Sequence, residues 1–232
     1  MSDAQQQTQQ RHRLYGRAAG KPLSKRQQSL VDDLLPKLAI PETGQGELFP
    51  AVLFSAATQG VWLEIGFGGG EHLAGQAARH PGTAFVGAEP FVDGVAKLLT
   101  AIDEQGLSNI RLRRGDARDL VSTFAGASID RAFILFPDPW PKTRHRKRRL
   151  VQPDFVAELA RVMKPGAKLR FATDWADYAN RALADILRDG RFTWQATRVD
   201  DWRNPPADHV TTRYQEKRLG DCAPVFLDFV RK

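Results

Sequence analysis

The chain has 232 residues and 42% hydrophobic side chains, which is enough to bury the core of one globular domain. Its single cysteine, Cys222, cannot form an internal disulfide, and the first thirty residues lack the apolar core of a signal peptide. No stretch approaches the roughly 18 unbroken apolar residues of a membrane helix. These observations argue against a disulfide-stapled, secreted or membrane-spanning protein and predict a cytoplasmic location.

The net charge of +7 is concentrated in two segments. Residues 142–149 hold six of the 34 Lys and Arg, and residues 1–26 hold another six beside one acid, Asp3. The remaining chain carries 22 bases and 26 acids, so its body is mildly acidic. Two basic segments on such a body indicate a polyanionic partner such as a nucleic acid; a solvated tail and a solvated loop are the alternative. The Gln-rich residues 1–23 are expected to form a disordered basic arm, and residues 24–232 a single domain with an N-terminal helical extension.

Strand and helix patterns alternate from Val61 onward. Before them, Ser24 and Gln27 form a capping box for a short helix that ends at Pro36, and residues 36–60 have loop composition. Strands are expected at residues 61–65, 83–88, 110–112, 129–136, 168–173, 192–197 and 225–230, with helices from about residues 71, 92, 153 and 176. The alternation predicts an α/β fold with helices around a mostly parallel sheet. Residues 199–224 read as one long loop, which in a compact domain is functional or disordered.

The first strand leads into the glycine-rich turn "LEIGFGGGEH", which contains Glu64, Gly66 and Gly68. Glycines between a strand and a helix let a ligand approach the backbone closely. The dinucleotide fingerprint requires its third glycine at position 71, but Glu71 stands there and its carboxylate would repel a pyrophosphate. The pattern therefore favours a ligand without phosphates, such as S-adenosyl-L-methionine, over a nicotinamide dinucleotide.

Two further carboxylates follow the next strands. Glu89 closes the second strand, where an acid can accept hydrogen bonds from ribose hydroxyls. Asp116 follows the third strand, where it can accept from an adenine amino group, with the Ala117 amide nearby. The alternatives are a surface acid for Glu89 and a helix N-cap for Asp116. Because Glu64, Glu89 and Asp116 all stand at strand ends, where open α/β sheets bind ligands, we favour the binding interpretation.

The fourth strand leads into "FPDPWPKTRHRKRR", in which Pro137 and Pro139 stiffen the turn around Asp138. "PDPW" is similar to the turns with which amino-methyltransferases place a polar group beside the methyl donor. The whole stretch resembles the bacterial tRNA (guanine-N7-)-methyltransferase family. The resemblance includes "LEIGFGGGEHL", "FVGAEPF", "RGDA", "FATDWADY" and "TTRYQEK", and so spans roughly residues 60–220.

The resemblance implies a Rossmann-like class I methyltransferase fold: a seven-stranded, mostly parallel sheet with helices on both faces and an antiparallel last strand. It also implies an enzyme that uses S-adenosyl-L-methionine to methylate N7 of a guanosine in tRNA. The family's target is the guanosine at standard tRNA position 46, in the variable loop. The expected partner is therefore tRNA.

Residue roles follow from the same resemblance. Contacts to S-adenosyl-L-methionine are expected from Glu64, Gly66, Gly68, Glu89, Asp116, Ala117 and Asp138. Asp138 is also the expected catalytic residue at the reaction centre. Contacts to the substrate are expected from Lys142, Asp174, Thr212, Arg213, Tyr214 and Gln215. The tRNA phosphates are expected to bind Arg144, His145, Arg146, Lys147, Arg148 and Arg149.

Three of these assignments have alternatives. Asp174 also suits the N-cap of the following helix, and Arg148 and Arg149 also suit ion pairs with the acidic body. Gln215 stands where the family has an acid, so this loop offers guanine a hydrogen bond without a charge.

The function class has alternatives as well. An RNA-binding module with a degenerate cofactor pocket and a nicotinamide-dependent oxidoreductase both remain open at this level. No metal site is expected, because His72 and His145 have no ligand spacing to other His or Cys residues. No obligate protein partner is evident, and the sequence leaves monomer and homodimer equally open.

Overall fold

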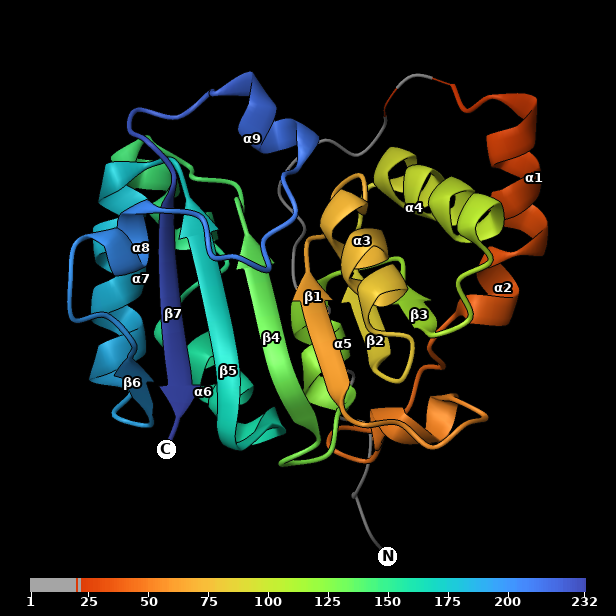
Figure 1. Cartoon of the computed structure of the whole chain (residues 1–232), viewed down its shortest axis with the longest axis horizontal. Helices are drawn as coiled ribbons and strands as arrows, with labels where there is room; N and C mark the ends of the chain where they lie inside the picture. Colours follow the sequence, from red (N-terminus) through yellow and green to blue (C-terminus); the bar gives the residue numbers. More distant parts are fainter. Residues whose placement is uncertain (1–19, 21) are drawn as a thin grey trace, which may run out of the picture.

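A seven-stranded sheet runs through the middle of the computed structural model, which describes residue 20 and residues 22–232 (Figure 1). The strands are β1 (Val61–Ile65), β2 (Ala84–Ala88), β3 (Ile110–Arg113), β4 (Ile129–Leu135), β5 (Met163–Thr173), β6 (Phe192–Trp194) and β7 (Val225–Arg231). Their order is β3-β2-β1-β4-β5-β7-β6, and the pairs from β3 to β5 are parallel. β7 pairs antiparallel with both β5 and β6. The predicted mostly parallel sheet with an antiparallel last strand is confirmed.

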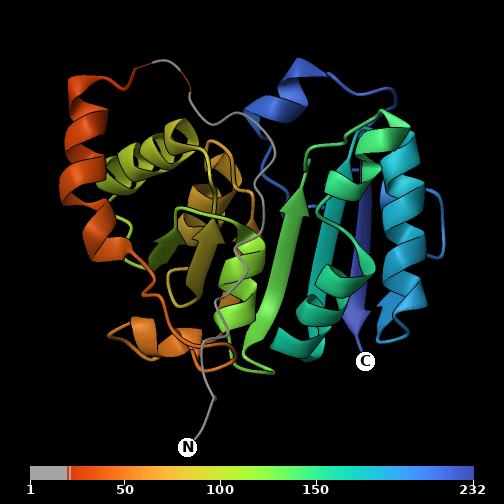
Figure 2. The same ribbon diagram turned by 180° about the vertical axis from the view of Figure 1, so that it is seen from behind.

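Helices cover both faces of the sheet, as Figures 1 and 2 show from opposite sides. One face carries α3 (Glu71–Arg79) and α4 (Val92–Gln105), and the other carries α5 (Ala117–Thr123), α6 (Pro153–Val162) and α7 (Ala176–Arg188). Two apolar cores fill the spaces between these helices and the sheet. Because β2 is buried along its whole length, its residues can be apolar on both faces, which explains the unbroken run "AFVGA".

The capping box predicted for the N-terminal helix is present. In α1 (Lys25–Asp33), the Ser24 hydroxyl accepts from the Gln27 backbone N–H at 3.2 Å, and the Gln27 side chain accepts from the Ser24 N–H at 3.1 Å. Arg26 pairs with Asp103 and Glu104 of α4 at 3.0 Å. The apolar side of α1 packs on the core beneath α4. The predicted arm, residues 1–23, lies almost entirely outside the described residues.

Several short elements were not predicted. Residues 36–60, expected to be a loop, include part of α2 (Leu35–Leu38) and the 3-10 helix η1 (Pro50–Leu53). Pro36 is tolerated because it lies in the first turn of α2, where its missing N–H is not needed. The loop expected at 199–224 contains α8 (Asp200–Arg203) and α9 (Arg213–Lys217), and the basic run forms the 3-10 helix η2 (Thr143–Arg148). Among the described residues, no helix is long and apolar enough to cross a membrane.

Candidate active site

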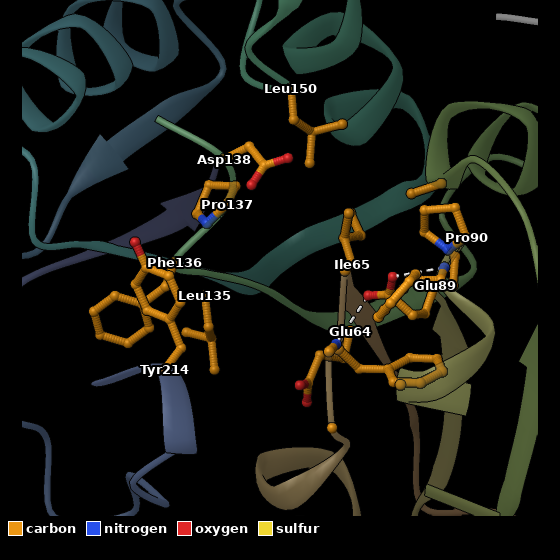
Figure 3. A pocket seen from close by; sticks show the side chains of 18 of the residues that line it. Glu64, Ile65, Glu89, Pro90, Leu135, Phe136, Pro137, Asp138, Leu150 and Tyr214 are labelled. Atoms are coloured by element: carbon orange, nitrogen blue, oxygen red, sulfur yellow. Dashed lines mark hydrogen bonds between the residues drawn. The ribbon is translucent and has the colours of Figure 1, made fainter. Parts of the chain in front are cut away.

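A pocket of about 620 Å³ opens at the carboxyl ends of β1, β2 and β4 (Figure 3). Its volume is that of a typical small-molecule site, and its position is where open α/β sheets bind ligands. The glycine turn, the turn around Asp138 and the start of α9 all contribute to its walls. Figure 3 shows Glu89 and Asp138 on opposite sides of the same space.

The glycine turn is built for close approach of a ligand. Gly66, Gly68 and Gly70 have φ angles of 68°, 55° and 80°, in the left-handed region that side chains disfavour. A Cβ at Gly66 or Gly68 would meet no protein atom within 4 Å, so the space beside both residues is open. Gly94 of α4 was not predicted; a Cβ there would lie 2.2 Å from the Gly68 carbonyl oxygen. The pocket therefore depends on small residues on both sides of this turn.

Glu89 holds the glycine turn in place. One carboxylate oxygen accepts the Gly68 backbone N–H and the other accepts the Phe91 N–H, each at 2.9 Å. Burial raises the pKa of Glu89, and these two hydrogen bonds oppose the rise. Glu89 is buried and lines the pocket, so the surface-acid alternative is wrong.

Glu64 is buried at the end of β1, and its carboxylate makes a 2.7 Å hydrogen bond to Nδ1 of His72 on α3. The sequence around His72 carries no signal of this pairing with Glu64. Across the described residues, no group of three or more His, Cys, Asp or Glu side chains is arranged to hold a metal ion.

Asp116 combines the two interpretations that the sequence left open. Its carboxylate accepts the Arg118 backbone N–H at 2.8 Å and thereby caps α5. It also accepts from Nε of the Arg118 side chain at 3.0 Å. Asp116 and Ala117 nevertheless both line the pocket. The cap fixes the carboxylate at the pocket wall.

The turn around Asp138 is strained on both sides. Phe136 and Trp140 have φ angles of 50° and 40°, and such a conformation costs roughly 1–3 kcal/mol for each bulky residue. A hydrogen bond from the Phe136 N–H to the Ala172 carbonyl, at 2.8 Å, holds one end. The Asp138 side chain is exposed toward the pocket, and desolvation by the surrounding walls raises its pKa.

The basic run divides into an outer and an inner part. Lys142, Arg144, Arg146 and Lys147 are exposed, and His145 and Arg148 are half-buried. Arg148 places its guanidinium 5.0 Å from the centre of the Trp140 ring and lines the pocket.

Arg149, by contrast, is only 2% exposed and points into the protein. Its Nε donates to the Pro139 carbonyl at 2.7 Å, and its Nη2 pairs with Asp177 at 2.6 Å. The guanidinium also stacks over the ring of the buried Tyr178 at 4.7 Å. Arg149 therefore ties the Asp138 turn to α7, which is the ion-pair alternative, and its buried position does not suit the predicted contact to RNA phosphates.

Only part of the predicted late loop lines the pocket. Thr212, Arg213 and Tyr214 do, and so does Lys217, which was not predicted. The Thr212 hydroxyl caps α9 by accepting the Gln215 N–H at 3.3 Å, and the Tyr214 ring packs 5.7 Å from the Phe136 ring. Gln215 does not line the pocket.

Asp174 lies outside the pocket lining and is 3% exposed. It is not the N-cap of α7, because the Ala176 N–H donates instead to Asp221, at 2.8 Å. Gly220 packs directly over Asp174, and a Cβ at position 220 would collide with it. Burial raises the pKa of Asp174, and its Oδ1 has no hydrogen-bond partner. Lys142 also lies outside the pocket lining.

The sheet order, the glycine turn and the acids at successive strand ends define a class I S-adenosyl-L-methionine-dependent methyltransferase. A family model described as "Putative methyltransferase" matches residues 58–225. The tRNA (guanine-N(7)-)-methyltransferase of Caulobacter vibrioides strain NA1000 is 58% identical over 219 residues, which cover 94% of this chain and 95% of the relative. The enzyme of the same name from Hyphomonas neptunium is 52% identical, over 94% of this chain and 98% of its own length. The chain belongs to the tRNA (guanine-N(7)-)-methyltransferase family.

Solved structures agree on the fold. The 16S rRNA methyltransferase KamB superposes with a TM-score of 0.53 over 76% of this chain and 90% of its own, at 16% sequence identity. An rRNA methylase from Streptococcus thermophilus gives a TM-score of 0.51 at 12% identity, over 90% of this chain and 99% of its own. At such low identity the match supports the fold alone.

Proposed function

We propose that this chain transfers a methyl group from S-adenosyl-L-methionine to N7 of a guanosine in tRNA, at position 46 of the variable loop. The observation that carries the proposal is the placement of Asp138, in a strained and anchored turn, across one pocket from the glycine turn and Glu89. Membership of the family supports the reaction and favours it over the binding-module and oxidoreductase alternatives.

The residues of the pocket fit this cofactor. The open space beside Gly66 and Gly68 admits a ligand to the backbone. Glu89 uses one lone pair of each oxygen on the backbone, so further lone pairs remain for ribose hydroxyls. Glu71 begins α3 at the pocket wall, where it disfavours a pyrophosphate. When bound, S-adenosyl-L-methionine supplies an electrophilic methyl group on a sulfonium.

The reaction requires the protein mainly to position the reactants and to stabilise the developing charge. Guanine N7 carries an in-plane lone pair in the neutral base, so no side chain has to remove a proton first. Orientation of the two reactants then accounts for much of the rate. Positive charge develops on the guanine, and the ionised Asp138 carboxylate stabilises it.

A carboxylate can also select guanine by accepting from its N1–H and N2–H edge, which adenine lacks. Asp138 and Asp174 are the candidates for this contact. The unpaired Oδ1 of Asp174 supports its assignment. Because Gly220 covers Asp174, this contact requires the neighbouring segment to move away first.

Two basic surfaces beside the pocket suit the RNA backbone. Lys142 and the following η2, with Arg144 and Lys147, form one surface, and α9 presents Arg213 and Lys217. Such contacts bind phosphates without reading sequence, and they weaken as salt rises. We leave Arg149 out of this set because it is buried.

The test is to incubate unmodified tRNA transcripts with the protein and methyl-labelled S-adenosyl-L-methionine, followed by nuclease digestion and nucleoside analysis. We expect label in N7-methylguanosine, lost when the guanosine at position 46 is replaced and lost in Asp138→Ala. Salt-sensitive tRNA binding without label and without saturable cofactor binding would favour the binding-module alternative. Tight NADH binding would favour the oxidoreductase.

A further inference from the structure

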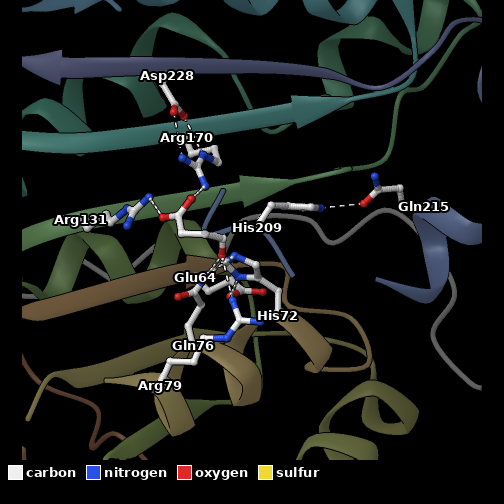
Figure 4. Close-up of polar contacts among 10 residues, drawn as sticks. Glu64, His72, Gln76, Arg79, Arg131, Arg170, His209, Gln215 and Asp228 are labelled. Carbon is white, nitrogen blue, oxygen red and sulfur yellow. Dashed lines mark hydrogen bonds and ion pairs between the residues drawn. The ribbon is translucent and has the colours of Figure 1, made fainter. Parts of the chain in front are cut away.

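The stretch between α8 and α9, residues 204–212, is called the crossing segment here. In Figure 1 it crosses in front of β7, β5 and β4, on the face of the sheet where α3 covers β1 and β2. It carries no regular helix or strand along these residues. Asp208 lies near its middle and makes contacts to three different elements, through Gln76, Arg131 and Arg170, which Figure 4 labels.

The Asp208 carboxylate joins two strand arginines. Its Oδ2 lies 2.6 Å from Nη2 of Arg131 on β4, and its Oδ1 lies 2.7 Å from Nη1 of Arg170 on β5. Arg170 also pairs with Asp228 of β7 at 2.7 Å. The side chains of Arg131 and Arg170 are 13% and 5% exposed, whereas that of Asp208 is 36% exposed. The crossing segment thus supplies the only carboxylate that the described structure pairs with the half-buried Arg131 guanidinium.

The electrostatics agree with this geometry. Burial alone would raise the pKa of Asp208, but hydrogen bonds from Arg170 and the charge of Arg131 outweigh it and hold the pKa well below its usual range. The carboxylate therefore remains ionised at neutral pH, when both guanidiniums are charged.

The main chain of Asp208 is bound as well. Its carbonyl oxygen accepts from Nε2 of Gln76 on α3 at 2.6 Å. The same amide nitrogen lies 3.3 Å from Nε2 of His72, whose Nδ1 bonds to Glu64. In the tautomer in which Nδ1 of His72 donates to Glu64, its Nε2 accepts from Gln76, so the donors of His72 and Gln76 in this series of hydrogen bonds both have acceptors. Asp208 is thus linked through α3 to a residue of the pocket wall.

We infer that Asp208 is a positioning residue that fixes Thr212, Arg213 and Tyr214 at the mouth of the pocket before tRNA arrives. The inference rests on the proposed function. Thr212 follows Asp208 by four residues, which span at most about 14 Å, so anchoring one restricts the other. His209, the next residue, closes the loop by a 2.7 Å hydrogen bond from Nε2 to the Gln215 side-chain oxygen.

This arrangement also gives Gln215 a role within the loop. The amide oxygen of Gln215 is a neutral acceptor for a neutral His209, and burial lowers the pKa of His209. The position where the family has an acid thus serves here to brace the loop against the crossing segment.

The test compares Asp208→Asn, which keeps the shape and removes the charge, with Asp200→Asn, an exposed acid of α8, as the matched control. Three quantities are measured on the full chain: kcat and KM for a tRNA transcript, the Kd of S-adenosyl-L-homocysteine, and the initial rate of tryptic cleavage after Arg213, Lys217 and Arg218. For Asp208→Asn we expect KM to rise at least tenfold, cofactor affinity to stay within twofold, and cleavage at these bonds to accelerate at least fivefold. Asp208→Glu, which keeps the charge, is expected to give KM and cleavage rates between those of the wild type and those of Asp208→Asn.

A second variant covers the case in which an unpaired Arg131 prevents folding. Arg131→Met with Asp208→Asn removes the pair together and leaves Arg170 with Asp228. Wild-type KM and wild-type cleavage in a folded variant would overturn the inference, and so would cofactor affinity falling in parallel with that for tRNA. The rate of tryptic cleavage can be measured without enzyme activity. Absence of methylation by the wild-type protein would therefore refute the proposed function, while the cleavage rates would still test whether Asp208 anchors the loop.

Discussion

Replacing Arg149 separates its structural role from the RNA-binding role of its neighbours. In Arg149→Ala, the hydrogen bond to the Pro139 carbonyl is lost, which costs about 1.5–3 kcal/mol for a charged donor. The stacking on the buried Tyr178 adds roughly 1–2 kcal/mol. The pair with Asp177 adds little, because that carboxylate is half-exposed and keeps Arg146 at 3.1 Å. The expected total is about 3–5 kcal/mol, or a fall of roughly 6–20 °C in Tm for a domain of this size.

The assay pairs this variant with Arg144→Ala, an exposed position of the same run. Thermal unfolding and the salt dependence of tRNA affinity are measured for both. Arg149→Ala is expected to lose stability and kcat, because the Asp138 turn loosens, with an unchanged slope of log K against log salt. Arg144→Ala is expected to keep its Tm and lose about 0.7–0.9 from the slope. A wild-type Tm together with a reduced slope in Arg149→Ala would refute the assignment.

Further outcomes follow from the same geometry. Gly68→Ala is expected to weaken S-adenosyl-L-homocysteine binding at least tenfold, measured by calorimetry. Gly106 also has a left-handed backbone with open space beside it, but it lies outside the pocket. Gly106→Ala should therefore reduce stability by a similar amount and leave cofactor binding unchanged. Because desolvation raises the pKa of Asp138, kcat/KM should fall with decreasing pH at a midpoint above about 4. Asp138→Asn should abolish this acid-side fall along with most activity. A midpoint at or below about 4 would contradict the assignment. Because the pKa of Asp208 is lowered on folding, its stabilising effect should be complete at neutral pH and shrink as pH falls below about 4. The measurement is the difference in free energy of unfolding in urea between wild type and Asp208→Asn. A difference that grows in acid would contradict this prediction.

Local patterns in the sequence predict the sheet, the glycine turn and the turn around Asp138. Alternating apolar runs define strands directly, and glycines or prolines mark turns through the backbone conformations they allow. The acids at successive strand ends could be placed at one pocket because parallel strands share a carboxyl edge. These features follow either from residues that are close together in the chain or from the regular topology of a parallel sheet.

Features that depend on distant partners could not be predicted in this way. Arg149 looks like any other base in its run, and contacts with the Pro139 carbonyl, with Tyr178 and with Asp177, 28 residues later, hold it inward. Asp208 lies 77 residues from Arg131 and 38 from Arg170. The helices α8 and α9 have four and five residues, too short for a periodic pattern to show. Tertiary contacts decide each of these cases.

The crossing segment also bears on how substrate preference in such an enzyme can diverge. Helices α5, α6 and α7 are joined to the sheet by interlocking apolar side chains, so exchanging one of them forces the core to repack. The crossing segment is held through the carboxylate and carbonyl oxygen of Asp208 and through the ring of His209, which packs 4.9 Å from the Phe226 ring. Exposed positions of the segment, such as Asn204, Pro205 and Ala207, can thus change without repacking the core, and a new RNA target can arise while the folding of the domain is untouched.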